Sequence, residues 1–424
     1  MAKKQATPTQ SENTRLFTMK QRQQAFSKIR GNSDKDYRVV DPDKAEESTP
    51  YGLLTLDEIC GLGGIKRRGR VVEIHGEEHS GKSTLTYTIA ANYQKLTGEP
   101  VVIFDFERTG SWDYLHAIGV DDSLCELFQP DAIQDAEKRT LEFMKAGVRL
   151  FVYDSIVRMR EEVDEKAIMS GDAHKTTPGE HARAMEKFFN NMLTPAARHD
   201  SVLLMVNQVR ARIEASQEAM YAQKYPSFTN LPYVLPGGKT CRFTPSVMIE
   251  TKAHKAVRAG GGDDEFLLDP AVGTKDKEDH VATRVKVRIL KNKANGGGYR
   301  EGAMYMRPGL GFDDRISIRE YARDYGLIAN KGAKWYVGTD ADNAIANYPN
   351  KEAAIEDLVV KQNPQVLEKL RALVVEAVRN DNSGRHTFQL TDHEERYMTG
   401  VDDDHASGDV PKAKGFEVEE AELA

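Results

Sequence analysis

Residues 76–83 fit the pattern G-x-x-x-x-G-K-[ST], in which two glycines bracket a loop that leads into a lysine and a hydroxyl. The apolar run 71–74 has strand length, and residues 84–95 contain no Gly or Pro and indicate a helix. Between a strand and a helix, the N–H groups of such a loop and the helix N-terminus bind phosphate oxygens. The sequence therefore predicts a nucleoside triphosphate site at Gly76, Glu77, Glu78, His79, Ser80, Gly81, Lys82, Ser83 and Thr84.

Within this loop, two side chains have distinct chemistry. Lys82 would place a positive charge near the terminal phosphates, and Ser83 would offer its hydroxyl to Mg²⁺. ATP and Mg²⁺ are accordingly the expected cofactors.

Three more apolar runs have the length of buried strands: residues 101–104, 150–153 and 202–206. Helical segments separate them, which predicts an α/β fold with a mostly parallel sheet. Each run is followed by a residue able to act on a nucleotide, namely Glu107, Asp154 or Gln208. Because ligands bind at the carboxyl ends of parallel strands, we expect these side chains to gather beside the phosphate loop.

Each of the three has a role in triphosphate hydrolysis and an alternative. Asp154 would hold Mg²⁺ together with Ser83, directly or through water, or it is only one of the acids that commonly end a strand. Glu107 would orient and deprotonate the attacking water, or it is a solvated acid in a loop. Gln208 would sense the terminal phosphate, or it only satisfies backbone groups.

Composition narrows the class of protein. With 39% apolar and 29% charged residues among 424, the chain has the make-up of a soluble protein of two or three units. The net charge of −7 lies mostly in residues 401–424, which hold eight acids and two lysines, so a nucleic-acid partner is not excluded. The three cysteines are far apart and form no disulfide or metal pattern. Since no run reaches membrane-spanning length and the N-terminus lacks an apolar signal core, we expect a cytoplasmic protein without a membrane partner.

Patterning along the chain predicts four parts: an N-terminal helix–strand arm (1–50), the α/β core (51–314), a small α+β C-terminal domain (315–400) and an acidic disordered tail (401–424). The arm would pack on its own domain or on a neighbouring copy. The charged stretch 252–280 indicates a long flexible hairpin or insertion, and residues 352–378 have helical periodicity.

From about residue 52 to 313, the chain resembles the bacterial RecA recombinase family. The phosphate loop is common to many NTPases, whereas three other stretches are more specific: Asn-Gln-Val-Arg at 207–210, Gly-Gly-Lys at 237–239 and Lys-Asn-Lys at 291–293. The resemblance implies a P-loop NTPase core of RecA type in which Glu107 is the catalytic glutamate and Gln208 couples ATP to DNA. It also implies that Tyr114 lies against the adenine, and that Lys291 and Lys293 reach the ATP of the adjacent subunit.

Two segments match the DNA-binding loops of that family in position. The first is about 158–178 and the second about 209–239. The second alternates cations with aromatic rings, a pattern suited to single strands; the alternative is an ordered surface loop whose rings pack on its own domain. The predicted DNA-binding residues are Arg158, Arg210, Arg212, Gly237, Gly238 and Lys239. Gly237 and Gly238 indicate a hinge or a close approach to phosphate.

The resulting expectation is an ATP-dependent homologous recombinase and DNA-dependent ATPase. It would form a helical filament of its own copies on single-stranded DNA, pair that strand with duplex DNA and exchange strands. Two alternatives remain, a hexameric helicase built on the same core and a repair mediator that does not hydrolyse ATP.

Overall fold

The computed structural model describes residues 48–62, 64–161, 179–211, 231, 233–258, 280–295 and 300–381. All of them belong to one compact unit, Glu47–Ala424. Of the predicted arm only residues 48–50 are described, and the predicted acidic tail lies wholly outside the described residues. The domain boundaries at residues 50, 314 and 400 stay predictions.

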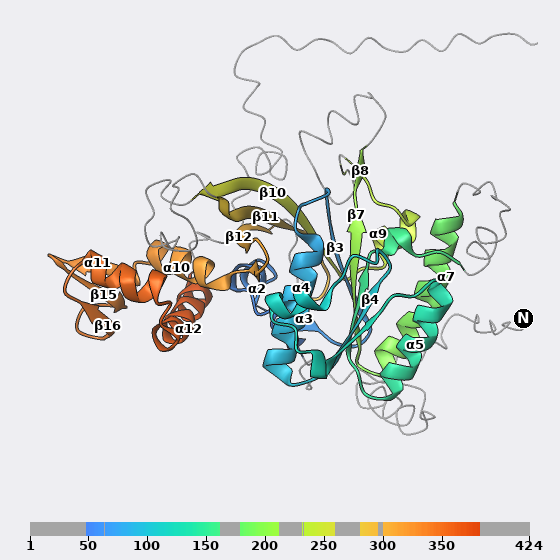
Figure 1. Cartoon of the computed structure of the whole chain (residues 1–424), viewed down its shortest axis with the longest axis horizontal. Helices are drawn as coiled ribbons and strands as arrows, with labels where there is room; N and C mark the ends of the chain where they lie inside the picture. The colour runs from blue at the N-terminus through green and yellow to red at the C-terminus, as the bar shows by residue number, and fades with distance from the viewer. Residues whose placement is uncertain are drawn as a thin grey trace, which may run out of the picture. The chain divides into compact units, whose positions relative to one another are not determined.

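A nine-stranded sheet forms the core of the described residues (Figure 1). Its strands are β3 (Arg70–Gly76), β4 (Val101–Asp105), β5 (Cys125–Phe128), β6 (Leu150–Asp154), β7 (Val202–Gln208), β10 (Val247–Arg258), β11 (His280–Asn292), β12 (Arg300–Arg307) and β13 (Gly311–Phe312). The spatial order is β13-β12-β11-β10-β3-β7-β6-β4-β5. The strands from β10 to β5 run parallel, and β11, β12 and β13 are antiparallel additions. The predicted α/β fold with a mostly parallel sheet is confirmed.

Helices cover both faces of this sheet (Figure 1). They are α3 (Lys82–Thr97), α4 (Trp112–Ile118), α5 (Ile133–Lys145) and α7 (Glu180–Arg198). Alternate residues of β3 divide between the two faces: Val72 and Ile74 pack into the core with α3, whereas Val71 packs into the core with α5 and α7. Because both faces are buried, the central strands β4, β6 and β7 are apolar at most positions, and this made them recognisable in the sequence. β3 also carries two buried polar residues, Glu73 and His75.

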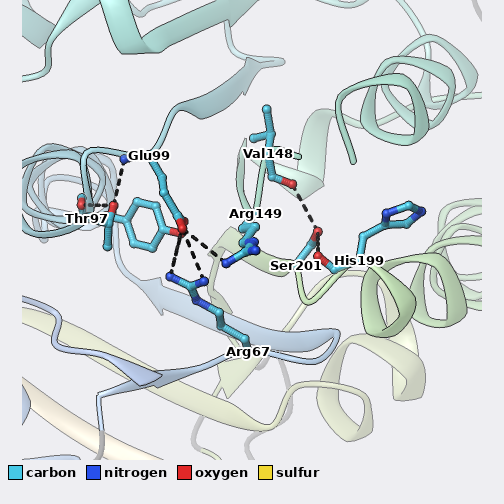
Figure 2. Close-up of polar contacts among 8 residues, drawn as sticks. Arg67, Thr97, Glu99, Val148, Arg149, His199 and Ser201 are labelled. Atoms are coloured by element: carbon cyan, nitrogen blue, oxygen red, sulfur yellow. Dashed lines mark hydrogen bonds and ion pairs between the residues drawn. The ribbon is translucent and has the colours of Figure 1, made fainter. Parts of the chain in front are cut away.

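Polar side chains contact one another at the end of the sheet where its parallel strands begin (Figure 2). Glu99, just before β4, accepts hydrogen bonds from Arg67 at 3.3 Å and from Arg149, just before β6, at 3.3 Å. Ser201, just before β7, donates from its hydroxyl to the Val148 carbonyl at 3.3 Å. These contacts connect the amino ends of the parallel strands. The predicted site residues lie at the opposite, carboxyl ends.

The long hairpin predicted around 252–280 is present in its described part. β10 and β11 pair antiparallel from Val247 opposite Asn292 to Arg258 opposite His280. β10 runs beside β3 only as far as Thr251, so the rest of the hairpin continues past the phosphate-loop strand. Residues 259–279 lie outside the described residues.

The predicted C-terminal domain is α+β in its described part. Its elements are α10 (Asp314–Asp324), β14 (Ile328–Lys331), β15 (Lys334–Gly338), β16 (Ala344–Tyr348), α11 (Lys351–Ile355), a π-helical turn (Glu356–Val360) and α12 (Pro364–Asn380). The helical stretch predicted at 352–378 is not continuous. Pro364 cannot donate a backbone hydrogen bond, and the Asn363 side chain caps a new helix by accepting from the Gln365 N–H at 3.2 Å.

Among the described residues, the remaining elements are short: β1 (Ser48–Thr49), α2 (Leu54–Ile59), β2 (Ile65–Lys66), β8 (Arg210–Ala211), β9 (Tyr233–Val234), α9 (Gly238–Phe243) and two 3₁₀ turns (Asp122–Leu124 and Ile156–Arg158). No helix in the described part of the chain has both the length and the apolar character needed to cross a bilayer. The three cysteines are buried and unoxidised.

A charged contact joins α2 to the C-terminal helices. Arg371 of α12 forms an ion pair with Asp314 of α10 and lies 3.9 Å from the carboxylate of Asp57 in α2. Asp314 also accepts the Leu54 N–H at 2.6 Å. Burial raises the pKa of Asp57 to about 7, and the Arg371 charge opposes that rise.

We expect Arg371→Ala to lower the free energy of unfolding by about 1–2 kcal/mol, less than for a fully buried pair, because the arginine is 33% exposed. The loss should be greater at pH 8 than at pH 6, since Asp57 ionises as the pH rises through about 7 and then lacks its counter-charge. Urea unfolding at both pH values measures this. Arg379→Ala, at the exposed end of the same helix, is the control and should change little.

Candidate nucleotide-binding site

The phosphate loop connects the end of β3 to the start of α3, and two glycines set its path. Gly81 has a φ of 86°, and a Cβ at Gly76 would lie 2.2 Å from the Thr251 carbonyl oxygen. Neither position therefore accepts a side chain without strain. The Ser80 hydroxyl lies 2.9 Å from the Thr251 hydroxyl, which anchors the loop to β10. The other loop side chains are exposed: Glu77, Glu78 and His79.

Lys82, the first residue of α3, is folded back on this loop. Its Nζ donates to the Glu77 carbonyl at 2.6 Å. Burial lowers the pKa of Lys82, while the carboxylates of Asp154 and Glu107 oppose that shift. The ammonium thus lies against the backbone of a loop that leads into a helix N-terminus, the kind of place where phosphate binds.

Asp154 ends β6 beside the start of α3 and is 2% exposed. Burial raises its pKa to about 6, while hydrogen bonds from the Ser83 and Tyr87 side chains lower it. Within the described residues, its buried Oδ1 makes no hydrogen bond. A free carboxylate oxygen near a serine hydroxyl is a donor set that Mg²⁺ accepts, so the residues present fit the predicted metal. Tyr87 is a site residue that the motif alone does not predict, although it follows Ser83 by four residues and so shares its helix face.

Glu107 and Gln208 are brought into contact. The Gln208 Nε2 donates to Glu107 Oε1 at 2.7 Å, and the Ser155 hydroxyl donates to the same oxygen at 2.5 Å. Asp105 shapes the turn that carries Glu107 by accepting the N–H groups of Glu107 at 3.1 Å and of Gly110 at 2.8 Å. The alternatives of a merely solvated acid and of an amide occupied with backbone are therefore both disfavoured. Ser155, directly after Asp154, is a further site residue that the sequence reading passed over.

Tyr114 lies on α4 beside the first turn of α3. Its hydroxyl is 2.5 Å from the Thr84 hydroxyl, and its ring meets Tyr87 edge-on with centroids 6.4 Å apart. The ring is half-buried next to the phosphate loop, a position compatible with an adenine contact.

Lys291 and Lys293 do not join the phosphate loop of their own chain. Lys291 pairs in the sheet with Met248, level with Glu73, and its Nζ donates to the Phe243 carbonyl at 2.8 Å. Burial lowers its pKa to about 8, and the charge of Lys293 adds to that effect. Lys293 is exposed at the end of β11. Their predicted role toward the ATP of another subunit stays a prediction.

The described residues of the two predicted DNA loops follow the carboxyl ends of the parallel strands, as the phosphate loop does. Arg158 and Arg210 are exposed just beyond the ends of β6 and β7. Gly237 and Gly238 have φ values of 89° and 70° and begin α9, and Lys239 is exposed on its first turn. Arg212, most of the first loop and most of the second lie outside the described residues.

Comparison with known proteins agrees with this geometry. The family model described as the RecA N-terminal domain matches residues 40–306. "Protein RecA" of Ruminococcus albus is 27% identical over 331 residues, covering 76% of this chain and 74% of that protein. The proteins of the same name from Borrelia duttonii and Deinococcus radiodurans are each 28% identical, over 79% and 78% of this chain and 83% and 80% of their own lengths. With more than half of its residues matched, this chain belongs to the RecA N-terminal domain family.

Proposed function

We propose that this protein is an ATP-dependent homologous recombinase. It would assemble on single-stranded DNA, pair that strand with duplex DNA and exchange strands, with DNA-stimulated ATP hydrolysis driving release. The observation that carries the proposal is the 2.7 Å hydrogen bond from Gln208 to Glu107. It links the strand that leads into the second predicted DNA loop to the carboxylate best placed for hydrolysis. The matched relatives are called Protein RecA, which supports the same function.

In this proposal the chain's own groups divide the work of hydrolysis. The loop N–H groups and Lys82 hold the phosphates, and Glu107 orients the attacking water and takes its proton. Mg²⁺ bound at Ser83 and Asp154 would supply positive charge to the phosphate oxygens. Gln208 would hold Glu107 in one position until DNA moves the segment that follows it.

DNA contact in the proposal is independent of base sequence. Arg158, Arg210 and Lys239 are exposed cations that would meet the phosphate backbone, with Arg212 as a further predicted contact. Lys291 and Lys293 would complete the ATP site of a neighbouring copy. That arrangement would make ATP binding a condition of filament assembly.

Purified full-length protein tests this directly. We expect ATP hydrolysis with Mg²⁺ to rise at least tenfold on adding poly(dT), and electron microscopy to show open helical filaments on the DNA. We also expect joint molecules between a circular single strand and homologous linear duplex. Closed rings that unwind a forked duplex would instead establish a helicase, and a hydrolysis rate indifferent to DNA would overturn the proposal.

A further inference from the structure

A buried polar cluster lies at the end of β3 that leads into the phosphate loop. His75, the residue before Gly76, is fully buried, and its Nε2 lies 3.0 Å from the Tyr233 hydroxyl. That hydroxyl donates its one proton to Glu250 at 2.7 Å, so His75 must be the donor in the first contact. Burial, followed by the Lys82 charge, lowers the pKa of His75 to about 3, so the ring is neutral. The contact with Tyr233 then assigns its one ring proton to Nε2.

A second connection runs alongside the first. Asn207 pairs with His75 in the parallel ladder of β7 and β3. Its side-chain amide donates to Glu73 at 3.1 Å and to the Pro236 carbonyl at 3.3 Å. Thus two consecutive inward positions of the phosphate-loop strand, Glu73 and His75, are connected to residues 233–236.

Residues 233–236 form the returning end of the second predicted DNA loop. Tyr233 and Val234 make up β9, which pairs antiparallel with Arg210 and Ala211 of β8, so the two ends of the loop close into a short ribbon. The outgoing end is also tied to the phosphate loop, since the Val209 N–H donates to the Gly76 carbonyl at 3.3 Å. The Tyr233 ring packs edge-on against His75 with centroids 5.8 Å apart. Of the loop aromatics, this one packs on its own domain.

We propose that Tyr233 and His75 are positioning residues that transmit the position of the second DNA loop to the phosphate loop, independently of the Gln208–Glu107 contact. DNA binding that displaces the β8–β9 ribbon would move the Tyr233 hydroxyl. His75 would follow, because its Nε2–H is buried and losing its acceptor would cost free energy. Gly76 is the next residue, so the phosphate loop would shift with it. This inference rests on the proposed DNA-dependent ATPase and deepens it by naming a second route.

Tyr233→Phe in the full-length protein is the test, because it removes one hydroxyl and keeps the ring against His75. We expect the turnover number for ATP at saturating poly(dT) to fall about fivefold or more, a typical size for a coupling between sites. The KM for ATP without DNA and the affinity for poly(dT), measured by anisotropy with a non-hydrolysable ATP analogue, should stay within about twofold.

Tyr348→Phe is the matched control, since it removes a comparable 2.7 Å hydrogen bond to Asp357 within the C-terminal part. It should leave the DNA stimulation unchanged. His75→Gln keeps an N–H donor in reach of Tyr233, whereas His75→Leu removes it. His75→Gln should therefore retain more DNA stimulation than His75→Leu. A purely structural role for the ring would not produce this difference. Wild-type stimulation that survives intact in Tyr233→Phe would overturn the inference, as would a loss traced wholly to weaker DNA binding. No stimulation in the wild type would overturn the proposed function itself.

Discussion

Glu107→Gln should reduce the DNA-stimulated rate of ATP hydrolysis by about 10²–10⁴-fold, the range associated with loss of a general base. The amide has the shape of the carboxylate and keeps an oxygen that can accept hydrogen bonds from Ser155 and Gln208. It cannot accept a proton from water, so the loss falls on the chemical step. Phosphate release with and without poly(dT) measures it.

ATP binding and assembly should survive this change. We expect the affinity of Glu107→Gln for a fluorescent ATP analogue to stay within about threefold of wild type, because Lys82 and the loop N–H groups remain. If the protein assembles as proposed, filaments of the variant should persist longer than those of wild type, since hydrolysis would no longer drive release. Glu126→Gln, an exposed glutamate on β5, is the matched control. A Glu107→Gln protein that still hydrolyses ATP within threefold of wild type would show that another group activates the water.

How far the sequence predicts this site depends on whether a contact is local. The phosphate loop, its strand and its helix lie within one stretch of chain, Arg70 to Thr97, and their pattern was sufficient to predict them. The four apolar strands could also be predicted, because strands that are buried on both faces have nearly continuous apolar runs instead of alternating apolar and polar residues. By contrast, β5 is a four-residue strand at the sheet edge with an exposed Glu126, and it was missed.

The contact between Glu107 and Gln208 could not be predicted from spacing. The two residues are 101 positions apart. Taken alone, Glu107 could be a solvated acid, and Gln208 could be an amide that only satisfies backbone groups. Only the strand order β7-β6-β4 brings the end of β7 and the turn after β4 to either side of β6, so that the two side chains meet. The same holds for Thr251, which supports the phosphate loop from 171 residues away, and for Tyr233, which reaches His75 across 158. Pairing of distant segments is a property of the topology, and no local pattern encodes it.

Asp154→Asn should separate binding of the metal from stability of the fold. In the folded protein burial raises the pKa of Asp154 from 3.8 to about 6. The folded state therefore binds the proton more tightly than the unfolded state, and the stability that this provides is lost as the pH rises from about 4 through about 6. Above that pH the wild type holds a buried charge at a cost of about 3 kcal/mol or less. The asparagine carries no such charge.

Without nucleotide at pH 8, Asp154→Asn should consequently unfold at the same temperature as wild type or up to several degrees higher, at ~2–4 °C per kcal/mol. Its ATP hydrolysis should fall by about 10²-fold or more, since the amide is a poor Mg²⁺ ligand. Mg²⁺ with an ATP analogue at about 100 times its Kd should stabilise wild type by about 2.7 kcal/mol and the variant far less. Differential scanning calorimetry with and without ligand distinguishes the two effects.

The wild type provides an internal check on the same carboxylate. Because Mg²⁺ must displace the proton, its apparent affinity in the presence of nucleotide should fall about tenfold for each pH unit below about 6. Asp154→Asn should lack this dependence, whereas Asp135→Asn, at an exposed position on α5, should retain it. If the ligand stabilises Asp154→Asn as strongly as wild type at pH 8, Mg²⁺ is held by other groups. The buried Oδ1 of Asp154 would then serve only the fold, and Ser83 would have to act with a different acid.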